Sequence, residues 1–239
     1  MDWKSLLKKC KEFQKEEIKA CCYDMYKKNK GTCWLKSKTL PDAEIMKLFR
    51  FIRAWDPRFS GKNSKKFQKI YKEIYRYIKS LESKTIESID LENKETKDKI
   101  RKVFNEVTKC GKRGKREWTD TSKILHCILP ELFVMWDDKI RRGVWSDNKK
   151  KLRANDKEWR KNKKKWNQPK DNKFTGKEYA FHFLPQMQKE ADEAIRSYQK
   201  DNNHCSRSKA IREMTNEAGD HTIAKLIDEY NYMIHTFRK

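Results

Sequence analysis

Apolar residues recur every three or four positions along most of this chain, which is the spacing that buries one face of an α-helix. The spacing predicts helices over 3–26, 42–52, 64–78, 95–109, 177–199 and 221–237. Residues 83–91 fit either a short strand or a turn, and no long alternation of apolar and polar residues predicts a sheet. We therefore expect an all-α, compact multi-helix globular fold.

Turn-forming residues mark the expected ends of these helices. Gly31 follows the first helix, and Pro and Gly residues punctuate a loop over 55–61. Ser64 is the expected N-cap of the third helix. Pro185 predicts a kink within the helix over 177–199, because proline removes one hydrogen bond of the helix.

The densest apolar stretch runs from Thr119 to Arg142 and reads TDTSKILHCILPELFVMWDDKIRR. Thr119, Asp120 and Thr121 are all suitable N-caps, which places Lys123 in the first turn of a helix. The positive end of the helix dipole disfavours an ammonium there, and a neutral lysine amine is a nucleophile that forms Schiff bases. The alternative is an ordinary surface lysine.

Two aspartates follow in the same stretch. Pro130 stops the first helix, and Asp137 or Asp138 is then placed to cap a helix that starts with Lys139 and Ile140. A capping aspartate contributes about 1 kcal/mol, so a purely structural role is one interpretation. The other is a carboxylate held rigidly, which deprotonates a nucleophile or stabilises a developing oxocarbenium ion.

Aromatic residues and a histidine flank these candidates. Trp118 and Trp136 have the flat apolar rings on which a displaced nucleobase stacks, although core packing explains them equally well. His126 lies three residues after Lys123, so it falls near the same helix face. It is a candidate substrate-binding residue or a core histidine.

The charge of the chain points to a polyanionic partner. It contains 59 Lys and Arg against 35 Asp and Glu, and the formal net charge is +24. Such an imbalance favours nucleic acid, through neutralisation of phosphates and release of counterions. A lysine-rich proteome encoded by an AT-rich genome is the alternative source of the excess.

Two segments concentrate this charge. Residues 110–116 read CGKRGKR, and their cations suit either a phosphate contact or a solvated linker. These cations are Lys112, Arg113, Lys115 and Arg116. Residues 148–173 form a basic insertion or loop with Trp159 and Trp166 interleaved, and eleven Lys or Arg lie between 149 and 170. Cations with aromatic rings are typical of nucleic-acid contact, and a solvated insertion is the alternative.

Several classes of protein find no support in the sequence. The seven cysteines contain no CxxC pair, so we expect reduced thiols and no zinc or iron–sulfur centre. No signal peptide and no apolar run of about 20 residues is present, which predicts an intracellular protein, cytoplasmic or nucleoid-associated, without membrane contact. No cofactor motif occurs, and a monomer is expected.

The 239 residues are enough for a sizeable core. We expect a single helical domain over 1–239, either undivided or in two lobes, 1–109 and 110–239, with a cleft between them. A Lys-opened helix, a short turn, an apolar run and an Asp over residues 118–142 together resemble the helix-hairpin-helix DNA glycosylases of base-excision repair.

The resemblance implies a function for three of the candidates. Lys123 would attack C1′ of a damaged nucleotide flipped out of double-stranded DNA, and a β-elimination would then nick the strand. Asp137 would be the acid/base or electrostatic residue, with Asp138 as the alternative. Glu117 to Thr121 lack the glycine turn that usually precedes the lysine in that family.

Two other functions stay open at this level. A non-enzymatic nucleic-acid-binding protein would use the 148–173 segment and show strong salt dependence. A helical protein–protein interaction module, with a basicity that reflects genome composition alone, is the third interpretation.

Overall fold

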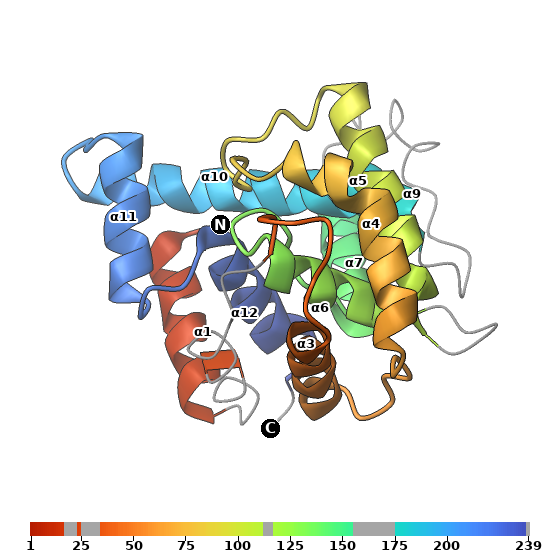
Figure 1. The fold of residues 1–239 in the computed structure, drawn as a ribbon. Helices are drawn as coiled ribbons and strands as arrows, with labels where there is room; N and C mark the ends of the chain where they lie inside the picture. The colour runs from red at the N-terminus through yellow and green to blue at the C-terminus, as the bar shows by residue number, and fades with distance from the viewer. Residues whose placement is uncertain (17–22, 25–33, 112–116, 155–174, 238–239) are drawn as a thin grey trace.

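A computed structural model describes residues 1–16, 23–24, 34–111, 117–154 and 175–237 of the chain (Figure 1). The longer helices are α1 Trp3–Glu16, α3 Asp42–Trp55, α4 Ser64–Lys79, α5 Lys94–Val107, α6 Trp118–Ile128, α7 Asp138–Ala154, α10 Leu184–Asp201, α11 Arg207–Glu217 and α12 Ile223–His235. Shorter turns of helix are the 3-10 turn Thr108–Cys110, α9 Gly176–Glu178 and the π-helical turn Tyr179–Phe183. Every element in these described ranges is helical, so the predicted all-α class is confirmed.

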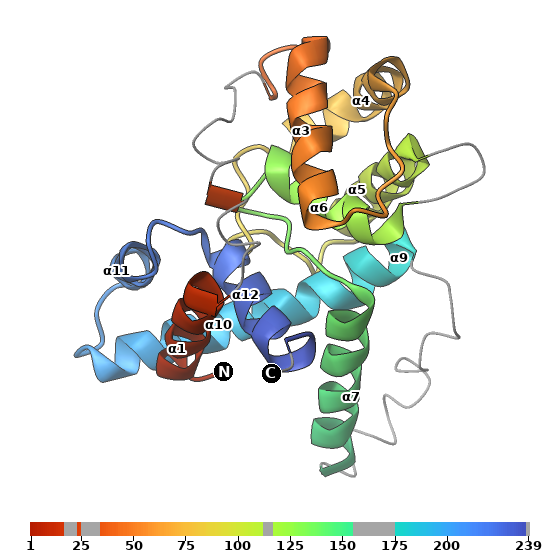
Figure 2. The same cartoon turned by 90° about the horizontal axis from the view of Figure 1, so that it is seen from below.

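The helices pack in two groups along α10, the longest of them. On one side α1 and α12 pack against each other and against α10, and α11 lies at the far end of α10. On the other side α3, α4, α5 and α6 form successive packed pairs (Figures 1 and 2). Helix α7 packs against α12.

Helix α4 illustrates how the sequence pattern becomes structure. Its buried face consists of Phe67, Ile70, Tyr71, Ile74 and Ile78, which recur every three or four residues as predicted. The N-cap is Asn63, whose side chain accepts the N–H of Lys66 at 2.9 Å. The expectation of Ser64 as the cap is therefore wrong by one residue, because Asn and Ser cap a helix about equally well.

Other boundaries differ from the predictions for identifiable reasons. Residues 83–91 form turns rather than a strand. Near Pro185, where a kink was predicted, the π-helical turn Tyr179–Phe183 is followed directly by α10, which has the proline in its first turn. Helix α11 was not predicted, because only Ala210 and Met214 are buried on it and so few apolar positions give no clear periodicity.

The basic segment over 148–173 also begins differently from the prediction of an insertion or loop. Residues 148–154 are the last turns of α7 and continue the helix that starts at Asp138. The remainder of the segment lies outside the described residues, as does the predicted extension of the first helix beyond Glu16, apart from residues 23–24.

One cluster of buried apolar side chains joins the two groups of helices. Its largest members are aromatic, and the rings of Trp136 and Tyr179 meet edge to face with centroids 5.1 Å apart. Phe104 of α5 stacks on Tyr179 at 4.5 Å, so α5, the 133–136 segment and the π-helical turn share one packed centre. None of the described helices is both long and apolar enough to cross a bilayer.

Candidate functional site

Helix α6 carries the candidate lysine into the interior. It begins at Trp118 with Glu117 in the N-cap position, and the Glu117 carboxylate does not cap the helix. Instead it accepts the backbone N–H of Ser60 at 3.1 Å. Lys123 is therefore in the second turn of the helix, and the prediction of a first-turn lysine preceded by a cap at 119–121 is wrong.

Lys123 is buried, with 6% of its surface exposed, and it is paired with acid. Its Nζ donates to Oδ1 of Asp120 at 2.9 Å and lies 3.8 Å from Oδ2 of Asp56. These carboxylates, rather than the helix dipole, set the electrostatic environment of the amine, since dipole effects fade beyond the first turn. The interpretation of Lys123 as a plain surface residue is excluded by its burial.

The two partner carboxylates of Lys123 differ in their proton affinity. Burial raises the pKa of Asp120 from 3.8 to about 6, against the opposing charge of Lys123. Burial acts in the same direction on Asp56, but the hydrogen bonds from Arg58 and the charge of Lys123 outweigh it and lower the pKa of Asp56. Asp120 is thus the better proton acceptor for the amine.

Lys123 opens onto a pocket of about 350 Å³, which is at the small end of the range for ligand sites. The pocket lining comes from the end of α3 and its following loop, α6, the 135–140 segment and α12. Its residues are Ala54, Trp55, Asp56, Pro57, Arg58, Thr119, Lys123, Met135, Trp136, Asp137, Ile140, Asp228 and Tyr232. Both halves of the chain, 1–109 and 110–239, contribute to it.

Asp137 lines this pocket and Asp138 does not. The Asp137 carboxylate accepts the N–H of Ile140 at 2.7 Å and the hydroxyl of Thr236 at 3.1 Å, so it caps α7 as predicted and is held in place. Asp138 instead forms ion pairs with Arg141 and Arg142 at 2.9 and 2.8 Å. Of the two candidate aspartates, the structure brings only Asp137 to the pocket that holds Lys123.

A buried carboxylate of the pocket that the sequence did not indicate is that of Asp228. Asp228 is 4% exposed, lines the pocket, and accepts a hydrogen bond from Lys225 at 2.7 Å. Burial raises its pKa from 3.8 to about 6, against the charge of Lys225. Its sequence context gave no signal, because Lys225 and Asp228 lie one turn apart on a helix, where such a pair usually faces solvent.

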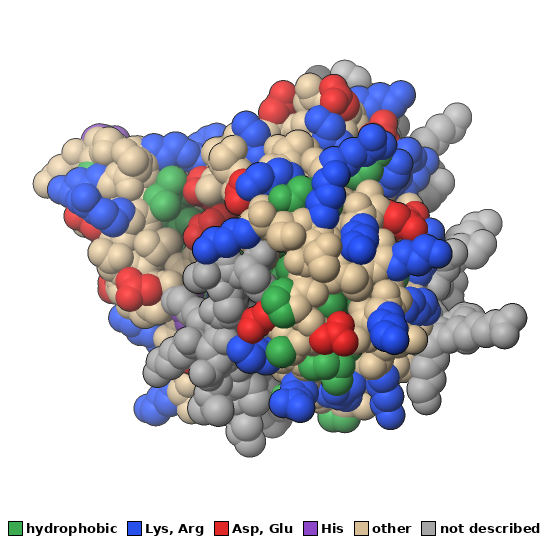
Figure 3. Space-filling view, in the orientation of Figure 1, with side chains coloured by type: hydrophobic (Ala, Val, Ile, Leu, Met, Phe, Trp, Pro, Cys, Tyr) green, Lys and Arg blue, Asp and Glu red, His purple; other side chains and the backbone are tan. Residues whose placement is uncertain are grey.

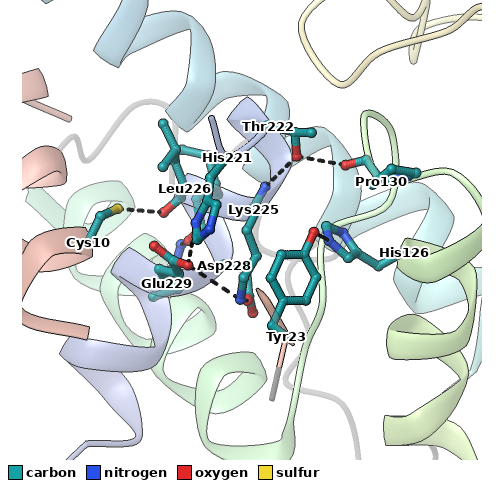
Figure 4. A network of polar contacts seen from close by, with 12 residues as sticks. Cys10, Tyr23, His126, Pro130, His221, Thr222, Lys225, Leu226, Asp228 and Glu229 are labelled. Carbon is teal, nitrogen blue, oxygen red and sulfur yellow. Dashed lines mark hydrogen bonds and ion pairs between the residues drawn. The ribbon is translucent and has the colours of Figure 1, made fainter. Parts of the chain in front are cut away.

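Lys225 anchors a buried polar network behind the pocket (Figure 4). It is fully buried, and its Nζ lies 4.7 to 4.9 Å from the ring centres of Phe13, Tyr23 and Trp55. Burial lowers the pKa of Lys225, but Asp228 and Glu229 raise it by more, so the net shift is upward. The network keeps a charged lysine beside the pocket wall and so fixes the Asp228 carboxylate.

His126 belongs to the core and not to the pocket lining. Its Nε2 lies 2.9 Å from the hydroxyl of Tyr23 and its Nδ1 lies 2.6 Å from the carbonyl oxygen of Phe133. Both ring nitrogens thus have partners inside the protein, which is the pattern of a satisfied core histidine. The structure does not bring His126 to the predicted substrate site.

The two flanking tryptophans have different positions. Trp136 lines the pocket with part of its surface, while its ring packs on Phe104, Tyr179 and Phe183. Trp118 is half-buried at the start of α6, outside the lining, and its carbonyl accepts the indole N–H of Trp136 at 3.5 Å. The remaining predicted residues, Lys112, Arg113, Lys115, Arg116, Trp159 and Trp166, lie outside the described residues.

The charge of the pocket is opposite to that of the whole chain. Three carboxylates line it, those of Asp56, Asp137 and Asp228, against the cations Lys123 and Arg58. Such a lining suits a ligand that is rich in hydrogen-bond donors or that develops positive charge, and it disfavours phosphate. Among the described residues, no group of three His, Cys, Asp or Glu side chains is arranged to hold a metal ion.

Comparison with known proteins gives no further constraint. The chain matches no protein-family model, no curated protein and no solved structure at a significant level.

Proposed function

We propose that this protein is a DNA base-excision enzyme that cleaves the N-glycosidic bond of a damaged or mismatched base, with the pocket between α3, α6, α7 and α12 as its active site. The observation that carries the proposal is the convergence of Lys123 and Asp137 on one pocket, although they are separated by a turn and an apolar run in the sequence. The net charge of +24 supports a nucleic-acid substrate.

The acidic lining suits this reaction. Cleavage of an N-glycosidic bond builds positive charge on the sugar, and fixed carboxylates stabilise that charge as it forms. Asp137 is fixed by two hydrogen bonds and Asp228 by the ion pair with Lys225. Aromatic walls from Trp55, Trp136 and Tyr232 complete a site into which a base flipped out of the duplex would enter.

In the proposed reaction Asp120 first accepts the proton of Lys123, for which its pKa of about 6 makes it better suited than an ordinary aspartate. The Lys123 amine then forms a bond to C1′, and the base leaves with the electron pair of the N-glycosidic bond and takes up a proton. Opening of the sugar ring gives an imine between Nζ and C1′. Loss of a C2′ proton then expels the 3′ phosphate and nicks the strand.

Borohydride trapping tests this proposal. Wild-type protein would be incubated with duplexes that carry an oxidised purine, a deaminated base or a mismatch, and a covalent protein–DNA band is expected with at least one of them. Lys123→Met removes the amine and should abolish the band, while Lys200→Met, at an exposed lysine on α10, should leave it unchanged. A band from an abasic duplex alone would not count, since any accessible amine reacts there.

The two aspartates supply a matched comparison in the same assay. Asp137→Asn keeps the cap of α7, because Asn caps as well as Asp, but removes the charge from the pocket. Base release should fall by roughly 10²-fold or more, whereas Asp138→Asn should release base at close to the wild-type rate. If no duplex gives base release or a band, while undamaged DNA still binds, the protein is a non-enzymatic nucleic-acid-binding protein instead.

A further inference from the structure

A line of cations runs along the exposed side of α4. The cationic stripe consists of Lys62, Lys65, Lys69, Lys72, Arg76 and Lys79. Lys62 precedes α4, and the other five are spaced alternately by four and three residues, so those five lie on one side of the helix. All six are exposed, and Lys and Arg side chains gather over this part of the surface in Figure 3.

Most of the stripe is not neutralised by neighbouring acids. The only acidic residue of α4 is Glu73, and no carboxylate in the described ranges forms an ion pair with Lys62, Lys65, Lys69 or Lys72. On the adjacent helix α5, by comparison, two cations pair with acids one turn away. Those pairs are Lys99–Glu95 and Arg101–Asp98.

Like charges one turn apart repel, so the stripe weakens α4 unless a polyanion covers it. From Lys65 to Lys79 the helix rises about 21 Å, which equals about six base steps of duplex DNA. Neighbouring cations of the stripe are therefore about 5 Å apart along the helix axis. A row of this length therefore spans about six successive phosphates of one nucleic-acid strand.

The stripe leads toward the candidate active site. Arg58 is on the pocket wall, with 87% of its side chain exposed, and pairs with Asp56. Lys62 follows it by four residues, a distance of at most about 14 Å even in extended chain. A strand bound along the stripe would thus pass the mouth of the pocket.

A lipid surface fits the stripe less well. Helices that bind in the plane of a membrane expose large apolar side chains beside their cations. Among the described residues the one exposed large hydrophobic side chain is Ile234, which belongs to α12. The apolar face of α4 is buried in the core.

We propose that the cationic stripe of α4 binds the phosphate backbone of double-stranded DNA and so positions the duplex beside the pocket. The choice of duplex DNA rests on the proposed function, whereas the stripe itself rests on the structure of α4. Specificity for a base would come from the pocket, and the stripe would contribute affinity without sequence preference.

Fluorescence anisotropy with a labelled, undamaged duplex longer than the stripe tests this proposal. Lys65→Ala/Lys69→Ala/Lys72→Ala should weaken binding about tenfold or more near 100 mM salt. It should also reduce the slope of log K against log salt by about 1 for each lysine removed. The matched control is Arg196→Ala/Lys200→Ala/Arg212→Ala, which removes equal charge from exposed positions on α10 and α11 at the other end of the molecule.

Equal weakening by the two triple variants would overturn the proposal, because it would mean that only net charge matters. So would an unchanged affinity of the α4 variant with its helix content intact by circular dichroism. Loss of binding to phosphatidylserine vesicles, with duplex binding unchanged, would assign the stripe to a membrane instead. Undamaged DNA separates this test from the proposed function, since binding to it requires no base release and no covalent bond to the protein.

Discussion

Lys123 and Asp120 lie one turn apart on α6, and their Nζ and Oδ1 atoms are 2.9 Å apart in a site where both side chains are more than nine-tenths buried. A buried ion pair adds little stability compared with apolar residues, because desolvation of both charges offsets their attraction. Removing one partner lowers the stability of the fold, because the other is left buried with an unpaired charge or must change its protonation state. This asymmetry gives the first prediction.

Lys123→Met should lower the free energy of unfolding by about 3 kcal/mol, which is the lower end of the range for a broken buried pair. The low value follows because Asp120, with a pKa of about 6, can take up a proton once the lysine is gone. The double variant Asp120→Asn/Lys123→Met should recover most of the loss. Urea denaturation of the wild type and the two variants measures both effects, and an equally unstable double variant would contradict the pair as the cause.

The raised pKa of Asp120 also predicts how stability depends on pH. Its pKa is about 6 in the folded protein and near 3.8 in the unfolded chain, so the folded state binds more protons between these values. The protonated Asp120 carboxyl therefore contributes to the free energy of unfolding fully below about pH 4, and this contribution is lost as the pH rises through 6. In Asp120→Asn, unfolding free energies measured across this range should fall less with rising pH than in the wild type. Parallel curves would refute the raised pKa.

Much of the fold could be predicted from the sequence, because amphipathic helices are local patterns. The buried faces of α3, α4 and α5 contain the residues that their apolar periodicity indicates. Periodicity failed at α11, where the buried residues are few, and it placed the start of α6 too late because polar residues at 120–122 face the interior. The sequence near a helix start does not show whether a threonine there caps the helix or is buried within its first turns.

The site was predictable only in part, for a physical reason. Lys123 and Asp137 stood out because a cation and a carboxylate interrupt an apolar run. Asp56 and Asp228 come from distant parts of the chain and reach the pocket only through the packing of α3 and α12. Their local sequences are those of ordinary polar residues, so nothing short of the tertiary structure identifies them.

The network around Lys225 gives a prediction about the aromatic side chains that enclose it. Lys225→Met should destabilise the protein by about 3–5 kcal/mol, because Asp228 and Glu229 lose their buried cation. Tyr23→Phe keeps the ring beside the lysine and removes only the hydrogen bond with His126, so its cost should be about 1 kcal/mol. Comparable losses in the two variants, measured by chemical denaturation, would mean that the charge of Lys225 is not what stabilises this region.

The capping role of Asp137 predicts a difference from its neighbour in stability. Asp137→Ala removes the acceptor for the N–H of Ile140 and should cost about 1 kcal/mol, while Asp137→Asn should be nearly neutral. Asp138→Ala loses partly exposed ion pairs with Arg141 and Arg142, and its cost should be smaller. Thermal unfolding of the three variants checks this order, and a larger loss in Asp138→Ala would reverse the assignment of the cap.

The last prediction concerns Gly143, where α7 approaches α12. A methyl group there would overlap the imidazole ring of His235, which is largely buried between the two helices. At an unobstructed helical position Ala is more favourable than Gly by about 1 kcal/mol, but here overpacking should make Gly143→Ala destabilising by about 1–3 kcal/mol. A double-mutant cycle isolates the cause, because in a His235→Ala background the same substitution should become neutral or stabilising. If Gly143→Ala is equally destabilising in both backgrounds, contact with His235 is not the reason that glycine occupies this position.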